Sequence, residues 1–278
     1  MKKGFRRRLI QLLAAVLYNC NFKGFATGHI YKGESKGVCV PGLNCYSCPG
    51  AVGACPLGSL QSGLLSSPFR FPMYVLGLLL LFGILLGRLV CGFLCPFGLL
   101  QDLLDKIPVK KIKKNRVTAA LTYLKYIILL VFVVLIPIAL KYPGFCKYIC
   151  PAGTLEGGIP LLLANESLRK MTGFLFSWKC AVLLAVLLLC VFCHRAFCRF
   201  LCPLGAFYSL FNPVSFFGIR VDHKKCNGCN ACAHNCKMDV KKVCDRECIQ
   251  CGECIGVCPE KAICYGIKLP EKDGSVIK

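Results

Sequence analysis

The chain has 278 residues, 24 of them cysteine, and its 35 Lys and Arg against 13 Asp and Glu give a formal net charge of +22. A hydrophobic fraction of 56% and a mean hydropathy of +0.60 exclude a disordered chain, and the length excludes a small disulfide-bonded scaffold. Residues 1–220 hold 25 of the basic and 5 of the acidic residues, so the positive charge belongs to the most apolar part. Basic clusters between apolar runs are typical of membrane topology, and we expect no nucleic acid partner.

Four apolar stretches follow one another along the chain. They cover residues 9–18, 72–94, 118–140 and 176–197. The last three approach the ~20 residues that cross a bilayer as a helix. The first is short and follows a basic start, as in a signal peptide, but no small-residue cleavage site comes after it. We therefore predict an all-α bundle of four transmembrane helices in which the first is uncleaved.

The distribution of Lys and Arg predicts the orientation of these helices. With four crossings, the N-terminus, the loop at 97–117 and the C-terminus share one side, and the loops at 23–71 and 141–177 lie on the other. The first side is the more basic, which predicts a multi-pass plasma-membrane protein with both termini in the cytoplasm. Its basic residues include Arg6–Arg8, Lys106, Lys110, Lys111, Lys113, Lys114 and Arg116.

A short pattern, Cys-Pro-x-Gly-x-apolar, recurs along the chain and indicates an internal repeat. The four copies begin at Cys55, Cys95, Cys150 and Cys202. In the last three copies another cysteine lies four residues earlier, at Cys91, Cys146 and Cys198. The first copy is instead preceded by Cys39, Cys45 and Cys48.

The spacing of the repeat suggests how it would present thiolates. Cysteines at i and i+4 face one side of a helix, the proline cannot continue that helix, and the glycine permits a sharp turn. Two such pairs make four ligands, the number that a [4Fe-4S] cluster needs. With four crossings, one cluster would lie on the cytoplasmic side, held by Cys91, Cys95, Cys198 and Cys202. A second would lie on the outer side, with Cys39, Cys45, Cys48, Cys55, Cys146 and Cys150 as six candidates for four positions.

Two arginines accompany the inner pairs at the same spacing. Arg88 lies three residues before Cys91, and Arg195 lies three residues before Cys198. A cluster with four thiolates is anionic, so these cations would offset its burial and contribute to the cofactor site. Alternatively, both arginines extend to the cytoplasmic membrane interface.

The C-terminal sixty residues carry the most specific pattern in the chain. Two runs of Cys-x2-Cys-x2-Cys-x3-Cys have the spacing of bacterial two-cluster ferredoxins, in which the fourth cysteine of each run ligates the other cluster. The spacing predicts one cluster on Cys226, Cys229, Cys232 and Cys258, and another on Cys248, Cys251, Cys254 and Cys236. Zinc sites use two pairs per ion and fit this pattern poorly. Cys244 and Cys264 are left over as packing thiols.

One weaker pattern lies near the end of the fourth apolar stretch. Cys190-x-x-Cys193-His194 matches a haem attachment site, but it lies inside a predicted membrane helix towards the cytoplasmic end, so haem is disfavoured. His194 alone is either a proton acceptor near a quinone or an interface residue. The outer cysteines could also form disulfides.

The two Cys-x3-Cys-Pro pairs followed by a two-cluster ferredoxin tail resemble the NapH-type membrane ferredoxins and the membrane half of NosR, over roughly residues 72–268. The resemblance implies a polytopic plasma-membrane protein that passes electrons between the quinone pool and a redox partner. The ligands carried over are the two inner pairs and the eight ferredoxin cysteines. The outer cysteine motifs are additional, and they look like those of a subgroup of uncharacterised membrane 4Fe-4S proteins.

These observations predict two domains: a four-helix transmembrane domain over 1–217, and an α+β ferredoxin domain with two [4Fe-4S] clusters over 218–278. The expected function is electron transfer between a cytoplasmic redox protein, the ferredoxin clusters and the membrane clusters. From there electrons would go to or from quinone, or across the bilayer to an outer partner. A role in metal reduction, assembly or redox sensing is the alternative. No catalytic acid–base residue is expected.

Overall fold

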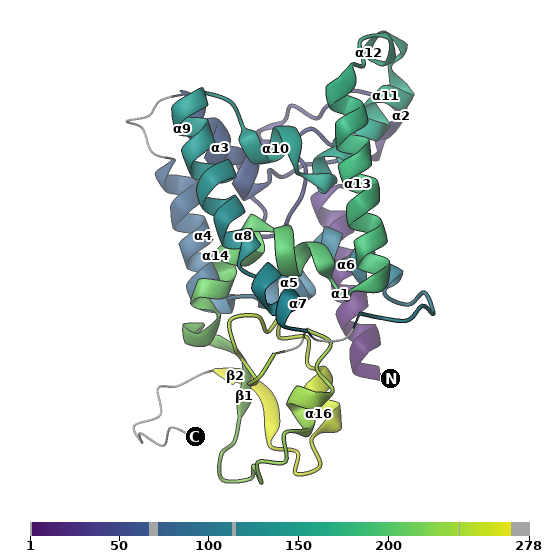
Figure 1. Ribbon diagram of the computed structural model, residues 1–278. Coiled ribbons are helices and arrows are strands. Elements are labelled where there is room, and N and C mark those ends of the chain that lie inside the picture. The colour runs from purple at the N-terminus through teal and green to yellow at the C-terminus, as the bar shows by residue number, and fades with distance from the viewer. Residues whose placement is uncertain (1, 67–71, 113–114, 239, 268–278) are drawn as a thin grey trace.

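The computed structural model describes residues 2–66, 72–112, 115–238 and 240–267, and it is mostly helical (Figure 1). Lys113 and Lys114 of the basic loop and residues 268–278 of the predicted ferredoxin domain lie outside the described residues. Four longer helical runs stand side by side: α1 (Lys2–Tyr18), α4 (Met73–Leu86), the run from α7 to α9, and α13 (Phe174–Phe192). The third run consists of α7 (Arg116–Leu121), α8 (Leu124–Ile128), the π-helix η2 (Leu129–Leu135) and α9 (Ile136–Leu140).

Shorter helices fill the two ends of this bundle and its interior. Near one end lie α2 (Phe22–Thr27), η1 (Glu34–Gly37), α3 (Pro56–Ser66), α10 (Gly144–Tyr148), η3 (Gly153–Gly158), α11 (Ile159–Ala164) and α12 (Glu166–Lys170). In the lower half lie α5 (Leu89–Phe93), α6 (Pro96–Leu104), η4 (Phe197–Leu201), α14 (Pro203–Phe211) and η5 (Asn212–Val214). The C-terminal segment contributes β1 (Phe217–Val221), α15 (Ala231–His234), α16 (Glu253–Val257) and β2 (Ile263–Ile267).

The C-terminal segment caps the end of the bundle where the N-terminus lies (Figure 1). Its two strands pair antiparallel, with Phe217 opposite Ile267 and Val221 opposite Ile263. The segment between them carries all eight cysteines of the two ferredoxin runs. The chain therefore holds this cysteine-rich segment against the lower ends of the long helices.

Two helical runs are long and apolar enough to cross a membrane: Val117–Leu140 and Phe174–Phe192. The apolar stretch at 72–94 is instead broken, because α4 ends at Leu86, and Gly87, with a φ of 54°, turns the chain before α5 begins. The stretch at 176–197 breaks in the same way, since α13 ends at Phe192 and Arg195 has a φ of 50°. Left-handed residues thus separate each of these helices from the cysteine pair that follows it.

The predicted local geometry of the cysteine pairs is wrong in one respect. Cys91 lies in α5, but Cys95 is the extended residue before α6, so the two do not share one helix. Cys202 likewise precedes α14. In both copies the proline is the first residue of the new helix, a position that needs no backbone N–H and suits the fixed φ of proline.

The repeat glycine also has a different role from the predicted turn. Gly98 and Gly205 lie inside α6 and α14, where a Cβ atom would come within 3.1 Å of the Cys91 carbonyl oxygen and 3.2 Å of the Cys198 carbonyl oxygen, respectively. Glycine is needed because each new helix packs closely against the backbone of a cysteine segment.

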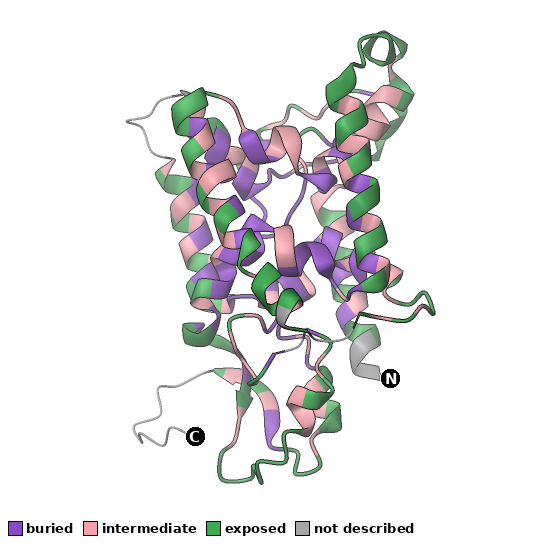
Figure 2. Cartoon of the chain, in the orientation of Figure 1, coloured by how far each residue is buried: buried purple, intermediate pink, exposed green. Residues whose placement is uncertain are grey.

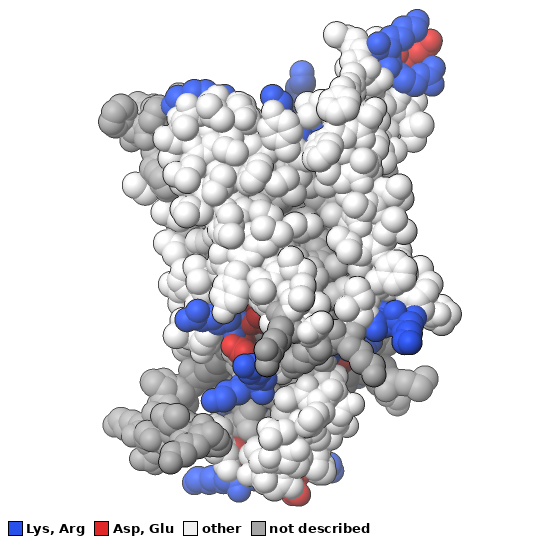
Figure 3. Space-filling model, in the orientation of Figure 1, with Lys and Arg blue, Asp and Glu red and all other residues white. Residues whose placement is uncertain are grey.

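The outward faces of the long helices are apolar, and the charged groups lie elsewhere. Exposed residues cover the outer sides of the helices while the interior is buried (Figure 2), and they include Leu81, Leu130 and Leu184. In the space-filling view a wide uncharged band separates charged groups near the top from those at the lower end (Figure 3). The interior nonetheless buries three cationic side chains completely: Arg88, Lys125 and Arg195.

Candidate metal centres

Four thiols meet in the lower half of the bundle. They are those of Cys91, Cys95, Cys198 and Cys202, and all four side chains are buried. Burial raises the pKa of the Cys202 thiol, and the neighbouring thiols of Cys198, Cys91 and Cys95 raise it further, because one thiolate opposes ionisation of the next. The structure thus brings together the four inner cysteines that the repeat singles out.

Two hydrogen-bond donors from the following helices reach these sulfurs. The Gln101 side-chain amide donates to Cys198 Sγ at 3.0 Å, and the backbone N–H of Gly205 donates to Cys202 Sγ at 3.4 Å. Sequence reasoning missed Gln101, although its place six residues after Cys95 is repeated by Gln61 after Cys55. Donors aimed at thiolate sulfurs stabilise the ionised form that binds iron.

The two arginines cross between the cysteine segments. Arg88, just before Cys91, donates through Nη2 to the carbonyl of Cys198 at 3.2 Å, and Arg195, just before Cys198, donates through Nη1 to the carbonyl of Cys91 at 2.7 Å. Both side chains have no exposed surface, so the alternative that they extend to the membrane interface is wrong. Each cation ties the two halves of the site together.

A buried carboxylate holds Arg195 in place. Asp102 in α6 accepts two hydrogen bonds from Arg195, at 2.7 and 2.6 Å, in a bidentate pair, and Arg7 of α1 reaches the same carboxylate at 3.0 Å. Bidentate pairing of this kind fixes a guanidinium in one orientation. It also stabilises the left-handed backbone of Arg195.

A second carboxylate joins the inner site to the C-terminal segment. Glu247, the residue before Cys248, accepts hydrogen bonds from Arg88 at 2.8 Å and from Lys125 of α8 at 2.6 Å. Burial opposes ionisation of Glu247, but the charges of Arg88 and Lys125 outweigh it and lower its pKa. Sequence reasoning missed Lys125 and Glu247, because nothing in the local pattern pairs residues 122 positions apart.

The ferredoxin cysteines form one tight group and one more open one. Burial raises the pKa of Cys254 to about 12, and Cys248, Cys251, Cys236 and Cys232 raise it further, in that order, so all four lie near Cys254. The group therefore contains the four cysteines that the crossed spacing predicts for one cluster, together with Cys232, which the spacing assigns to the other. Cys232 lies near Cys226 and Cys229, and all three are at least partly exposed. Cys258, predicted as the fourth ligand of that cluster, is partly exposed as well.

The outer cysteines do not all lie together. A cavity of about 690 Å³ between α3, α10 and η3 is lined by Cys45, Cys55, Cys146 and Cys150. Cys39 and Cys48 are buried but do not line it. All 24 cysteines lie within the described residues, and none of them is bonded to another there.

The residues present fit iron–sulfur clusters, because the four inner side chains that meet are all cysteine thiols, the ligands that a [4Fe-4S] cluster takes. Among the described side chains, no three Cys, His, Asp or Glu converge closely enough to bind a single ion. Buried donors are also left over beside the inner site. The donors Nε and Nη1 of Arg7 and Nε2 of Gln11 have no partner among the described residues, and Gln11 Nε2 lies next to Gly98 of the inner repeat. Anionic sulfurs would supply the missing acceptors.

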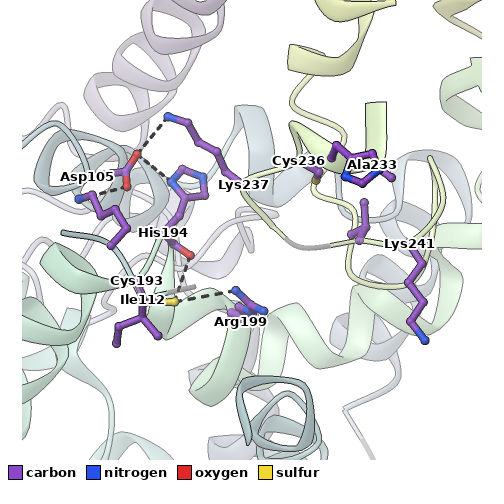
Figure 4. Close-up of a pocket in the computed structure, with 12 residues that line it drawn as sticks. Asp105, Ile112, Cys193, His194, Arg199, Ala233, Cys236, Lys237 and Lys241 are labelled. Carbon is purple, nitrogen blue, oxygen red and sulfur yellow. Dashed lines mark hydrogen bonds and ion pairs between the residues drawn. The ribbon is translucent and has the colours of Figure 1, made fainter. Parts of the chain in front are cut away.

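A second cavity, also of about 690 Å³, opens between the membrane bundle and the C-terminal segment. Figure 4 shows Asp105 between His194 and Lys237, at 3.0 and 3.2 Å, with Cys236 on the opposite wall. Burial opposes ionisation of Asp105, but hydrogen bonding to His194 and the charge of Lys237 lower its pKa. His194 is mostly buried in this network and is not a free interface residue.

The leftover cysteines make ordinary contacts. Cys190 of the haem-like pattern is buried in α13 and donates to the Gln101 side-chain oxygen at 3.5 Å. Cys264 lies 3.4 Å from Arg220 Nε, and Cys244 donates to the carbonyl of Ile219. These contacts are consistent with packing roles.

Comparison with known proteins matches the chain to a family model described as a 4Fe-4S binding domain. The model matches three times, at residues 69–115, 124–162 and 176–220, and each match contains one Cys-x3-Cys-Pro pair. No solved structure matches the chain.

Several curated proteins are similar over most of the chain. The uncharacterised protein MJ0750 of Methanocaldococcus jannaschii is 30% identical over 76% of this chain and 85% of its own length. The ferredoxin-type protein NapH of Escherichia coli is 25% identical over 73% of this chain and 70% of its own length. The regulatory protein NosR of Pseudomonas aeruginosa is 29% identical over 62% of this chain but only 24% of its own length. Together with the thiol sites, these similarities show that the chain belongs to the NapH/NosR-type family of ferredoxin-like 4Fe-4S electron-transfer proteins.

Proposed function

We propose that this protein relays electrons between a cytoplasmic redox partner and the membrane, through two clusters in a ferredoxin domain (218–278) and one or two in a transmembrane domain (1–217). A [4Fe-4S] cluster supplies reversible one-electron transfer without making or breaking covalent bonds to its substrate. The chain's own residues bind, orient and insulate the clusters.

Four transmembrane helices are supported by the surface of the bundle. In addition to the two long apolar runs, α1 and α4 expose large apolar side chains such as Leu13 and Leu81, each more than half exposed. Contiguous apolar surface of this kind suits lipid rather than water. The N-terminus and the C-terminal segment lie at the same end (Figure 1), which agrees with the proposed orientation with both in the cytoplasm.

The proposed ligands follow the thiol groups described above. In the ferredoxin domain, Cys248, Cys251, Cys254 and Cys236 hold one cluster, and Cys226, Cys229, Cys232 and Cys258 hold the other. In the membrane domain, Cys91, Cys95, Cys198 and Cys202 hold the inner cluster, with Arg88 and Arg195 beside them. The outer cysteines provide a further site.

The single observation that carries the proposal is the position of Arg88. Its guanidinium donates to the carbonyl of Cys198 in the inner site and to Glu247, which precedes Cys248 in the ferredoxin segment. The two segments also touch directly, because a Cβ atom on Gly92 would lie 2.4 Å from the carbonyl oxygen of Ile249. One cationic side chain therefore joins the ligand loops of two proposed clusters. An electron relay requires its clusters to lie close together in this way.

Beyond the inner cluster the electrons have two routes. A membrane quinone would exchange electrons and protons near His194 and Asp105, whose cavity borders Cys236. Alternatively, electrons continue through the outer site to a partner on the other side.

Iron and sulfide analysis of anaerobically purified protein tests the cluster content. We expect at least about twelve irons per chain, four for each cluster. Eight or fewer would remove the membrane clusters from the proposal.

Liposomes test the function itself. Reduced ferredoxin added outside should reduce either a quinone in the bilayer or an acceptor trapped in the lumen. If neither is reduced by protein with full iron content, a role in sensing or assembly replaces electron relay.

A further inference from the structure

The outer cavity repeats the construction of the inner site. The inner site combines the second and fourth copies of the Cys-Pro-x-Gly pattern, and the outer cavity combines the first and third, which begin at Cys55 and Cys150. Because each site combines two alternate copies of the repeat, the outer cavity is the structural equivalent of the inner site.

A glutamine occupies the same place in both sites. Gln61 lies six residues after Cys55, is fully buried, and donates from Nε2 to Cys146 Sγ at 3.3 Å. Its oxygen accepts the backbone N–H of Phe145 at 3.2 Å. Gln101, six residues after Cys95, donates to Cys198 Sγ at 3.0 Å and accepts the N–H of Cys198 at 3.4 Å. Both glutamines thus bond the first cysteine of the partner pair and the adjoining backbone.

The second cysteine of each partner pair is also bonded alike. The backbone N–H of Gly153 donates to Cys150 Sγ at 3.3 Å, and that of Gly205 donates to Cys202 Sγ at 3.4 Å. Three of the four inner thiols therefore have outer counterparts: Cys55 for Cys95, and Cys146 and Cys150 for Cys198 and Cys202.

Cys45 supplies the fourth outer thiol. A Cβ atom on Gly157 would lie 3.2 Å from Cys45 Sγ, so this sulfur packs against the helix that follows Cys150. Cys45 lines the cavity together with Cys55, Cys146 and Cys150, whereas Cys39 and Cys48 do not.

A buried carboxylate fixes the loop that carries Cys45. Glu156, six residues after Cys150, accepts the backbone N–H of Cys45 at 2.8 Å. The sixth position after each pattern cysteine thus holds a polar residue in every copy: Gln61, Gln101, Glu156 and Tyr208. In the fourth copy, Tyr208 donates to the carbonyl of Pro41 at 3.0 Å, in the same loop.

This loop also connects the outer cavity to the inner site. A Cβ atom on Gly42 would lie 3.1 Å from Cys95 Cα, and the backbone of Leu43 hydrogen-bonds the Cys95 thiol. The next backbone group, that of Asn44, hydrogen-bonds the Cys55 thiol of the outer site. Adjacent residues therefore touch a thiol of each site, and consecutive Cα atoms are only about 3.8 Å apart.

We propose that Cys45, Cys55, Cys146 and Cys150 bind a second membrane [4Fe-4S] cluster, with Gln61 as its side-chain hydrogen-bond donor and the Leu43–Cys45 backbone as its link to the inner cluster. Cys39 and Cys48 are not ligands. The assignment names the ligands of a second membrane cluster within the proposed function. It rests on that function only for the identification of the bound group as an iron–sulfur cluster.

Matched serine variants test the ligand assignment. Wild-type protein should contain about sixteen irons and sixteen sulfides per chain, and Cys45→Ser should lower both to about twelve. Cys48→Ser and Cys39→Ser, in the same loop, should keep about sixteen. Loss of about four irons in Cys48→Ser with retention in Cys45→Ser would overturn the assignment.

Two further measurements keep the result independent of folding defects. An anomalous iron map of wild-type protein should show density among the four named thiols. Electron paramagnetic resonance of the fully reduced protein should show spin coupling between two membrane clusters, which Cys45→Ser removes while the ferredoxin signals persist.

The outcomes separate the two proposals. About twelve irons in wild-type protein, with no iron density in the outer cavity, would overturn this inference but leave the proposed relay intact. Eight or fewer would remove both membrane clusters. Zinc in the cavity instead of iron would also overturn the inference.

Discussion

Gln101 shows how one side chain can tune the proposed inner cluster. Its amide donates to Cys198 Sγ at 3.0 Å from a position with no exposed surface. Hydrogen bonds to ligand sulfurs stabilise the more negative, reduced state and raise the reduction potential of a cluster. The residue therefore acts on the cluster through the cysteine that it contacts.

Replacing this donor should lower the potential of the inner cluster. For Gln101→Leu we expect a decrease on the order of tens of millivolts, the equivalent of one net hydrogen bond. Redox titration followed by electron paramagnetic resonance measures it. Gln61→Leu is the matched control, because its amide reaches Cys146 and should leave the inner potential unchanged. An unchanged inner potential in Gln101→Leu would contradict the assigned role.

At the residue scale the sequence predicted the arginines but not their partners. The shared spacing of Arg88 and Arg195 before their cysteines singled out two side chains that the structure buries completely. Their crossed contacts depend on how distant segments pack, which no local pattern encodes. Gln61 and Gln101 could have been found, since both follow the repeat cysteine by six residues. Lys125 could not, because a lone lysine in an apolar stretch gives no sign of Glu247.

At the scale of elements, the repeat glycine is a packing device. Gly98 lets α6 lie against the Cys91 carbonyl, which a Cβ atom would approach to 3.1 Å. Gly77 in α4 has nothing within 4 Å of such an atom and makes a suitable comparison.

Alanine should disturb the site at position 98 but not at position 77. Gly98→Ala should push α6 from the cysteine segment, destabilise the site by about 1–3 kcal/mol, and speed the loss of iron to a chelator. Gly77→Ala should lose iron at the wild-type rate. The two rates, followed by cluster absorbance, measure the effect, and equal rates would show that the close approach is unimportant.

Helix boundaries near the cysteines were the least predictable elements. Residues 72–94 form one apolar stretch in the sequence, but the chain turns at Gly87. The buried guanidinium of Arg88 follows directly inside the bundle. Hydropathy averages over such a break, since the residues on both sides are apolar. The proline of the repeat does lie at a helix boundary, but it begins the following helix instead of ending the preceding one.

The docking of the C-terminal segment depends on the Glu247 carboxylate. It is bonded to two cations that have no exposed surface, Arg88 and Lys125, so its removal leaves buried charge uncompensated. Glu247→Gln should weaken the docking by about 3 kcal/mol. We expect faster proteolysis within 218–267 and slower electron transfer from the ferredoxin clusters to the inner cluster. Glu253→Gln, at an exposed carboxylate of α16, should change neither.

At the scale of the whole molecule, charge is arranged in layers. On the face seen in Figure 3 an uncharged band separates two charged ends, and the net charge of +22 lies mostly on residues 1–220. Composition and the cysteine spacing were enough to predict the family. Four of the six outer cysteines line the outer cavity and two do not. The sequence could not predict this division, because it depends on the fold of the 39–55 loop.

The end of the bundle that carries the C-terminal segment should attract an acidic electron donor. Lys237, Lys241 and Lys111 line the cavity that borders Cys236, close to a proposed cluster (Figure 4). Complementary charge speeds encounter and is screened by salt, with a Debye length of about 8 Å at physiological ionic strength.

Transfer from a soluble acidic ferredoxin should therefore slow as salt rises. Lys241→Glu should reduce the second-order rate constant several-fold at low salt and flatten its salt dependence, because the steering charge is reversed. Stopped-flow reduction of the clusters measures this rate. Lys170→Glu in α12, at the opposite end and well exposed, is the control and should leave the rate unchanged. Equal slowing in both variants would mean that net charge, rather than this cavity, governs the encounter.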